Sequence, residues 1–176
     1  NSGTIDANDQ TWIFNPVPDF NWGLNVQLGY KNFDLSMFFQ GVCGVDVYNN
    51  QKFQTDFWSI TDAGSNKGNR MLGAWTKDNT SSSIPALTTN NTGDEGRASS
   101  YFVEHGNWMK LRTLQIGYNF ADSLLKKLHM TSARVYVSGQ NLFTWKSSSF
   151  TISDPENPNW AYPHSSSVSF GLQVSF

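Results

Sequence analysis

The residues best suited to chemistry in this chain are two acids in one loop and three scattered histidines. Asp154 and Glu156 stand two apart in the phrase D-P-E-N-P, and two carboxyl groups are the minimal machinery of a glycoside hydrolase. In a loop rich in proline, the simpler interpretation is that they form turns and accept hydrogen bonds. His105, His129 and His164 are widely separated and match no metal-ligand or catalytic-triad spacing. We therefore expect a protein that is not an enzyme.

A candidate ion site lies at the start of the chain. The segment N-S-G-T-I-D-A-N-D is similar to the second half of a calcium loop, in which Gly permits a sharp turn and the final acid supplies paired oxygens. Asp6 and Asp9 are the candidate ligands for a structural calcium ion. The first half of such a loop is missing and Ser2 replaces the usual carboxylate, so a turn with solvated acids is the favoured alternative. We expect no other cofactor.

Four aromatic residues in polar loops are candidates for binding a substrate or a partner protein. Flat amphipathic rings stack on sugars and bury a large area at low entropic cost. The simpler alternative is that these rings pack within their own loops. The four candidates are Trp58, Trp75, Trp160 and Tyr162.

The elements that must position these loops are strands. Apolar residues alternate with mostly polar residues over five segments, and such alternation predicts strands with two different faces. The last segment, S-S-V-S-F-G-L-Q-V-S-F, shows it clearly, and the pair joined by Lys31 and Asn32 forms a tight hairpin. The predicted strands cover about 20–30, 33–41, 108–120, 133–143 and 166–176.

The length and the two faces of these strands favour a membrane barrel over a soluble sandwich. Eleven residues, tilted as in such barrels, rise roughly 28 Å, close to the apolar band of about 25 Å in an outer-membrane barrel. The apolar face would then meet lipid, with Trp22, Trp108 and Trp145 as interface residues, and it also carries Lys110 and Arg112 by strict alternation. The polar face would line the lumen, with Asp34, Gln40, Arg134, Gln140 and Gln173.

The connectors support the same interpretation. Strands that alternate in direction place Lys31–Asn32 and residues 121–132 at one end, and the longer segments 1–19, 42–107 and 144–165 at the other. Outer-membrane barrels have short periplasmic turns and long extracellular loops. Rings near the short turns would form one aromatic girdle, namely Tyr30, Phe33, Tyr118, Phe120 and Phe176. Short helices are expected in 51–63, 67–75 and 123–128.

Composition and length exclude several other classes of protein. A net charge of −2 gives no reason to expect nucleic acid, and the single cysteine excludes an internal disulfide. The mean hydropathy of −0.45 is compatible with membrane strands, which are only half apolar. No stretch of about 18 apolar residues exists, so a transmembrane helix is not expected. The first residues lack the features of a signal peptide, so an export signal would lie upstream. Five strands are too few to close a membrane barrel, so we expect part of a larger protein.

The order and spacing of several phrases resemble the carboxyl-terminal part of the SusC/RagA family of TonB-dependent outer-membrane transporters. The phrases are N-P-V-P-D-F-N-W-G-L (15–24), A-W-T-K-D-N with I-P-A-L after it (74–87), Y-F-V-E-H-G-N-W-M-K-L-R-T-L-Q-I-G-Y-N-F (101–120), R-V-Y-V-S-G-Q-N-L-F-T (134–144), D-P-E-N (154–157), Y-P (162–163) and S-F-G-L-Q-V-S-F (169–176). The closing strand also resembles the assembly signal of outer-membrane barrels, with Gly171, Val174 and Phe176 as its elements.

This resemblance implies an all-β fold: the chain would form an antiparallel transmembrane β-barrel segment, about the last five strands of a barrel of about 22 strands with a plug inside the lumen. It also implies a place in the cell outer membrane and import of oligosaccharides or peptides. The implied partners are a SusD-like surface lipoprotein that acts as a lid and the TonB complex, contacted through a missing amino-terminal part. Two alternatives stay open: a secreted all-β carbohydrate-binding module, and a passive porin. Solubility without detergent would favour the module, and the absence of a plug would favour the porin.

Overall fold

A computed structural model describes residues 10–56, 66–87, 97–157 and 161–176. These residues fall into two compact units. The sheet unit comprises Val17–Val45, His105–Phe150 and Tyr162–Phe176, and the loop unit comprises the described parts of Asn1–Pro16, Asp46–Glu104 and Thr151–Ala161. Each unit is described by itself.

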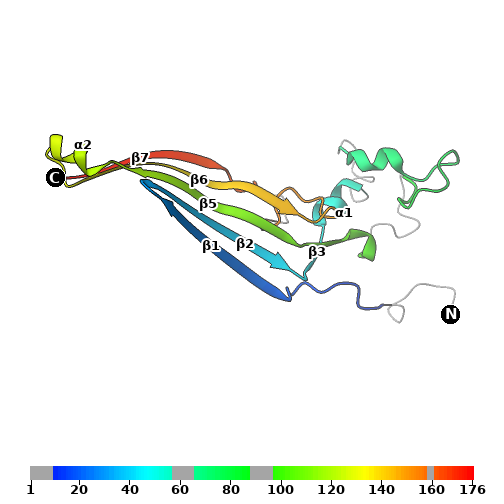
Figure 1. Cartoon of the computed structure of the whole chain (residues 1–176). Coiled ribbons are helices and arrows are strands. Elements are labelled where there is room, and N and C mark those ends of the chain that lie inside the picture. The colour runs from blue at the N-terminus through cyan, green and yellow to red at the C-terminus, as the bar shows by residue number, and fades with distance from the viewer. Residues whose placement is uncertain (1–9, 57–65, 88–96, 158–160) are drawn as a thin grey trace. The chain divides into compact units, whose positions relative to one another are not determined.

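The sheet unit contains one antiparallel sheet with the strand order β1-β2-β5-β6-β7 (Figure 1). The sheet is a meander, in which each strand pairs with the next one in this order. β2 and β5 are adjacent in the sheet although a long excursion separates them in sequence. The strands are β1 (Phe20–Tyr30), β2 (Phe33–Cys43), β5 (Trp108–Asn119), β6 (Ser132–Lys146) and β7 (Ser167–Ser175). The five predicted strands are therefore present, and β6 continues three residues beyond its expected end at Phe143.

The short connectors lie together at what we call the turn end of the sheet. Lys31 adopts a positive φ of 52° in the two-residue turn between β1 and β2. The second connector contains α2 (Asp122–Lys127), which was expected from the pattern of leucines and lysines. Figure 1 shows α2 beside the end of β7, at that same end of the sheet.

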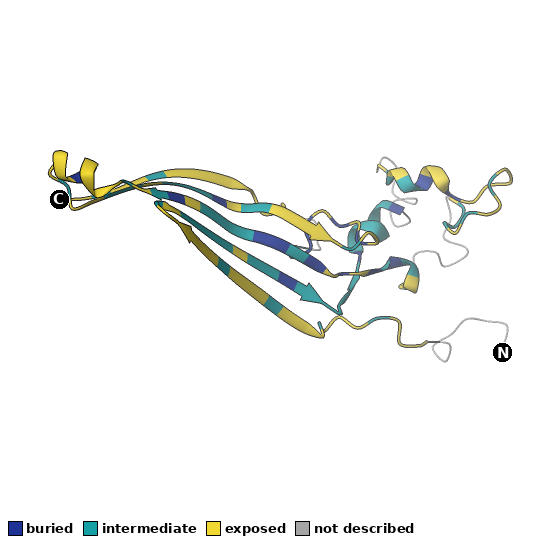
Figure 2. Cartoon of the chain, in the orientation of Figure 1, coloured by how far each residue is buried: buried dark blue, intermediate teal, exposed yellow. Residues whose placement is uncertain are grey.

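Residues that face each other across paired strands share one side of the sheet, so the register defines two faces. On the apolar face, Leu24 pairs with Phe39, Val26 with Met37 and Leu28 with Leu35. The same face continues through Ile116, Val137 and Phe170. Much of it is exposed: the exposed fraction is 58% for Leu28, 67% for Leu172 and 83% for Phe170. Exposure is most continuous along the outer strands β1 and β7 (Figure 2).

Aromatic rings of the apolar face gather at the turn end. Tyr30 pairs with Phe33, and the Phe33 and Tyr118 ring centroids lie 4.8 Å apart. Tyr118 in turn meets Phe120 edge to face at 5.5 Å, a favourable geometry for aromatic pairs. Four of the five residues predicted for an aromatic girdle thus occur together by pairing or ring contact, and Phe176 is 87% exposed.

Most of the loop unit comes from the segment between β2 and β5 in sequence. Its elements are β3 (Asp46–Tyr48), α1 (Asn50–Asp56), two short 3-10 helices, η3 (Asn69–Gly73) and η4 (Ser100–Phe102), and β4 (Val103–His105), which pairs with β3. Its core is Met71, Ala74 and Phe102, against which Tyr48 and Phe53 pack. A helix is therefore present in each of the two expected ranges: α1 begins at Asn50, and η3 is shorter than the expected range 67–75. Residues 57–63 of the first range lie outside the described residues. No described helix has the length and apolar character needed to cross a membrane.

Candidate functional site

The polar face of the sheet carries an ion pair that spans three strands. Arg134 on β6 donates from Nε to Asp34 Oδ1 at 3.1 Å and from Nη2 to Asp34 Oδ2 at 2.5 Å. Asp34 belongs to β2, and β5 lies between the two strands. Asn119 Nδ2 on β5 donates a further hydrogen bond to Asp34 Oδ1 at 3.1 Å. A planar guanidinium that grips a carboxylate with two parallel bonds fixes geometry as well as charge.

Gly117 on β5 leaves the space that this ion pair needs to cross the strand. It lies opposite Asp34 on one side and opposite Tyr136 on the other. A Cβ atom at position 117 would lie 2.5 Å from both Arg134 Nη2 and Asp34 Oδ1. The absent side chain therefore leaves the gap in which the two charges meet. The Arg134 guanidinium also lies 5.1 Å from the Tyr136 ring centroid, and that ring covers Gly171.

A second polar cluster surrounds Arg112, and it overturns one sequence expectation. Thr113 pairs with Phe38 and Leu111 with Phe39, so Arg112 is an extra residue in β5. Such a β-bulge shifts the alternation by one position. Arg112 donates from Nε to Gln40 Oε1 at 2.9 Å and from Nη1 to Asn141 Oδ1 at 3.2 Å. The prediction that Arg112 lies on the apolar face is therefore wrong.

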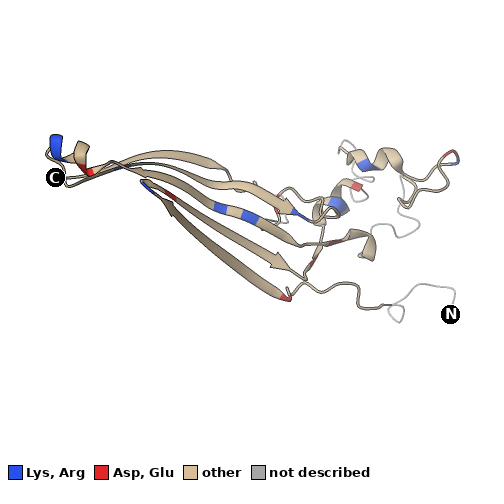
Figure 3. Cartoon of the chain, in the orientation of Figure 1, with Lys and Arg blue, Asp and Glu red and all other residues tan. Residues whose placement is uncertain are grey.

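The bulge moves the residues before it as well. Lys110 pairs with Gln40, and Trp108 with Val42, so both lie on the polar face instead of the apolar one. Only 2% of Lys110 and 9% of Trp108 are exposed, and the Lys110 Nζ lies 5.6 Å from the Trp108 ring centroid. The expected place of Trp108 in an interface belt is therefore also wrong. Figure 3 shows both basic positions on β5, whose neighbouring strands carry little charge.

The other two tryptophans of the expected belt do lie on the apolar face. Trp22 pairs with Gly41, and a Cβ atom at Gly41 would strike the Trp22 ring at 2.5 Å. Trp145 pairs with Met109 and lies 5.8 Å from the Phe143 ring.

Asn141 connects the Arg112 cluster to the segment before β7. Asn141 adopts a positive φ of 50°, a conformation that Asn tolerates better than most residues. The Asn141 Nδ2 donates to the Ser165 carbonyl at 3.3 Å, and Ser166 Oγ donates to the Asn141 carbonyl at 2.6 Å. Arg112 and Asn141 therefore tie together β2, β5, β6 and the entry to β7.

The five residues predicted to line a lumen all occupy the polar face. Asp34, Gln40 and Arg134 take part in the two clusters, whereas Gln140 pairs with Thr113 and Gln173 pairs with Arg134. Pairing alone places the last two residues on that face. Contacts with Gly117, Asn119, Arg112 and Asn141 were missed, because each one depends on the register between strands that are far apart in sequence.

The four loop aromatics fall in different units or outside the described residues. Trp75 belongs to the loop unit, is 41% exposed and donates its backbone N–H to the Ile84 carbonyl at 2.9 Å. Tyr162 belongs to the sheet unit and is 95% exposed. Trp58 and Trp160 lie outside the described residues, as do the candidate calcium ligands Asp6 and Asp9.

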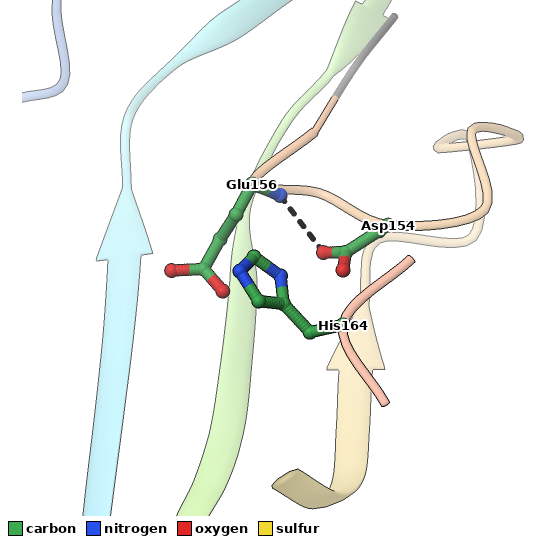
Figure 4. A group of neighbouring side chains, drawn as sticks. All are labelled: Asp154, Glu156 and His164. Carbon is green, nitrogen blue, oxygen red and sulfur yellow. Dashed lines mark hydrogen bonds between the residues drawn. The ribbon is translucent and has the colours of Figure 1, made fainter. Parts of the chain in front are cut away.

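Asp154 and Glu156 form a turn, as the simpler interpretation expected. The Glu156 backbone N–H donates to Asp154 Oδ1 at 3.1 Å, as Figure 4 shows, and the Asn157 N–H donates to the Asp154 carbonyl at 3.1 Å. Asp154 is only 4% exposed. An aspartate side chain that accepts from the backbone two residues on is a common turn-forming device.

The loop unit contains a buried polar network that no sequence pattern indicated. Asp56 is fully buried and accepts from the Tyr101 hydroxyl at 2.9 Å and from Arg70 Nε at 3.1 Å. Lys52 Nζ donates to the Tyr101 carbonyl at 2.5 Å and lies 3.8 Å from the Tyr101 ring centroid. These side chains come from three separate segments, so only the folded unit brings them together.

Burial sets the proton affinities in this network. Burial raises the pKa of the Tyr101 hydroxyl, and its hydrogen bond to the Asp56 carboxylate raises it further. Burial also lowers the pKa of the Lys52 ammonium, an effect that the nearby Glu104 charge partly offsets. Glu104 itself is held by Thr151, whose N–H and hydroxyl both donate to its carboxylate at 2.8 and 2.7 Å.

Several proteins of known type are similar to this chain over almost its whole length. TonB-dependent receptors P3 and P26 of Formosa agariphila are 32% and 30% identical to it, over 99% of the chain in both cases. TonB-dependent receptor SusC of Bacteroides thetaiotaomicron is 27% identical, again over 99% of the chain. The chain spans less than a fifth of these relatives, 18% of P3 and 17% of SusC. No protein-family model matches the chain.

Solved structures agree with this result. A structure of the RagAB peptide importer in the open-open state superposes with a TM-score of 0.79 at 25% identity, covering 98% of this chain and 19% of that one. A second structure, of the importer in the closed-closed state, gives 0.74 at 24% identity and covers 99% of this chain and 20% of that one. These relatives are named as receptors or as a peptide importer.

Proposed function

Because the chain belongs to the SusC/RagA family of TonB-dependent receptors, we propose that it forms part of an outer-membrane barrel that imports nutrient oligomers, either glycans or peptides. The observation that carries this proposal is the division of the sheet into two faces. The apolar face exposes Leu24, Leu28, Phe170 and Leu172. The polar face holds charges that are matched by partners within the sheet, as in the Asp34–Arg134 pair.

The two faces have different environments in such a barrel. Exposed leucine and phenylalanine side chains gain free energy in hydrocarbon, whereas a paired Asp and Arg are stable beside a hydrated lumen. The bulge at Arg112 supports this assignment, because it turns both basic residues of β5 away from the apolar face. The polar face would therefore meet the plug or a passing solute through Asp34, Gln40, Arg134, Gln140 and Gln173.

The outer strands β1 and β7 support a larger closed structure. Within the sheet each has one paired neighbour, so one edge of each strand offers its backbone groups to another strand. Unpaired backbone groups in hydrocarbon cost several kcal/mol each. Further strands of the same barrel would satisfy both edges, which agrees with relatives more than five times as long as this chain.

The proposed partners follow from the relatives. SusC and the RagAB importer support a pairing with a SusD-like surface lipoprotein and energy supply through the TonB complex. The loop unit and the segment around Tyr162 are the proposed lid contacts, with Trp58, Trp75 and Trp160 as aromatic anchors. The RagAB structures are of a peptide importer, whereas the substrate of this chain is left as a glycan or a peptide.

Fractionation and uptake together test this function. The full-length protein should be recovered with the outer membrane, require detergent, and support growth on an oligomeric nutrient only when TonB is present. A folded monomer in aqueous buffer would replace this proposal with a secreted binding module. Outer-membrane uptake that persists without TonB would replace it with a passive porin.

A structural calcium ion is a separate proposal for Asp6 and Asp9. If these residues bind the ion, calorimetry of the purified full-length protein should give a calcium signal that Asp9→Asn removes. Equal heats for the variant and the parent protein would leave the alternative, a turn with solvated acids.

A further inference from the structure

Two neighbouring hollows lie on the apolar face near the turn end. The first has a volume of about 250 Å³, and its apolar lining comes from Leu28, Tyr30, Phe33, Leu35 and Ile116. The second has a volume of about 270 Å³, and its main lining side chains are Phe33, Ile116, Tyr118, Val135, Val137 and Phe170. We call them the paired hollows. Phe33 and Ile116 line both, so these two side chains form the wall that separates the hollows.

Phe33 and Ile116 are both held in place by neighbouring strands. The Phe33 ring packs against Tyr118 at 4.8 Å between centroids, and Phe33 pairs with both Tyr30 and Tyr118 in the sheet. Ile116 pairs with Leu35 and with Val137, so the lining residues come from adjacent strands whose register is continuous here. The shape of the paired hollows is therefore fixed by the sheet and not by a loop.

A positive charge lies where the first hollow meets the turn end. The Lys31 Nζ lies 5.3 Å from the centroid of the Tyr30 ring, and Tyr30 lines the first hollow. Lys126 and Lys127 in α2 add positive charge at the same end of the sheet (Figure 3). The nearby Asp34 carboxylate is engaged by Arg134 on the opposite face. Asp122 in the first turn of α2 offsets one of these two charges, so the helix keeps a net positive charge.

We propose that the paired hollows bind one anionic glycerophospholipid, with one acyl chain on each side of Phe33 and the phosphate beside Lys31. The proposal rests on the proposed function, because it requires the apolar face to lie in a bilayer. Two neighbouring apolar hollows match the two chains of such a lipid, and the ammonium at the aromatic girdle matches its headgroup. Basic side chains at a membrane surface favour anionic lipids, and acyl chains gain free energy for each methylene group buried.

The test uses the full-length protein, purified in detergent and freed of lipid, and titrated with phosphatidylglycerol or phosphatidylethanolamine under native mass spectrometry. The parent protein should bind phosphatidylglycerol about fivefold more tightly than phosphatidylethanolamine, which is the effect of one surface cation. Lys31→Asn should remove this preference, and Lys31→Arg should keep it. Asn is chosen because it tolerates the positive φ of 52° at this position. Lys77→Gln, an equal charge change at an exposed residue of the loop unit, should have no effect.

The acyl-chain part has its own variants. Ile116→Trp fills the wall between the hollows and should weaken retention of both lipids, whereas Val168→Trp adds the same bulk on the same face outside them. Equal retention of the two lipids by the parent protein, or equal effects of the two tryptophans, would overturn the inference. Such a result with normal TonB-dependent uptake would reject the lipid site alone. A protein that needs no detergent would instead reject the proposed function.

Discussion

Asp34 and Arg134 meet over the backbone of a strand to which neither belongs, and Gly117 is the residue beneath them. Replacing Gly117 with Ala should therefore push the two charges apart, because the new Cβ would lie 2.5 Å from both. We expect the free energy of unfolding to fall by about 1 to 3 kcal/mol, as for other overpacked sites. The measurement is the thermal midpoint of the full-length barrel in detergent.

The matched control for this change is Gly29→Ala. Gly29 pairs with Asp34 on the same face, but a Cβ there would meet nothing within 4 Å. This variant should keep the parent midpoint. A similar loss in both variants would show that Gly117 matters for strand conformation and not for the ion pair.

Arg112→Lys should weaken the junction between the sheet and the segment that enters β7. A lysine has the charge but lacks the planar fork that reaches Gln40 and Asn141 together. Losing hydrogen bonds to a charged group typically costs about 1.5 to 3 kcal/mol. Hydrogen exchange at Asn141 and residues 165–167 should become faster. Arg97→Lys, at an exposed position of the loop unit, provides the control, and unchanged exchange in Arg112→Lys would contradict the bridging role.

Alkaline pH should loosen the loop unit through Tyr101. Its pKa in the folded unit is raised above the ordinary value of 10.0, so the folded unit keeps this proton at a pH where the unfolded chain has released it. The stabilisation is therefore complete below a pH of about 10 and is lost as the pH rises above it. Hydrogen exchange of residues 50–56 and 100–104 should accelerate as the pH rises above about 10, relative to strands of the sheet.

Tyr101→Phe separates this titration from general alkaline damage. The variant leaves buried Asp56 without one donor, which should cost about 1 to 3 kcal/mol at neutral pH. It should also flatten the alkaline response of the loop unit. An alkaline transition as steep as in the parent protein would mean that another group titrates.

Removing Phe176 should lower the amount of assembled barrel in the outer membrane more than the uptake per assembled molecule. Phe176 is 87% exposed and makes little contribution to packing within the sheet, so its loss should act on assembly. Heat-modified mobility on gels measures folded barrel, and uptake is normalised to it. Phe176→Tyr keeps a ring and should assemble normally. Equal assembly after removal would exclude Phe176 from the signal.

Local patterns were enough to predict the strands and the family. The hairpin from Phe20 to Gly41 needs only alternation and a two-residue turn, and both are visible in the sequence. The short helix α2 was visible in the same way. The comparisons confirm the resemblance to SusC/RagA proteins, which rested on several short phrases in order.

Non-local register explains what was missed. An extra residue at Arg112 looks the same in sequence as a regular position, so strict alternation put Lys110 and Trp108 on the wrong face. The Asp34–Arg134 pair joins residues 100 positions apart and depends on β5 lying between them. The strands β3 and β4 have three residues each, too few for alternation to show.

The bulge at Arg112 also bears on how this sequence can change by insertion and deletion. Deleting Arg112 would remove the extra residue and leave Lys110 and Trp108 on the polar face. Inserting or deleting one residue between Thr113 and Tyr118 would instead reverse the faces of all residues on one side of the change, and could turn Lys110 toward hydrocarbon. A length change in β5 outside the bulge is therefore comparable to a frameshift in a coding sequence, since every residue up to the next turn changes its face. A length change in a connector between strands does not alter which face the strand residues occupy.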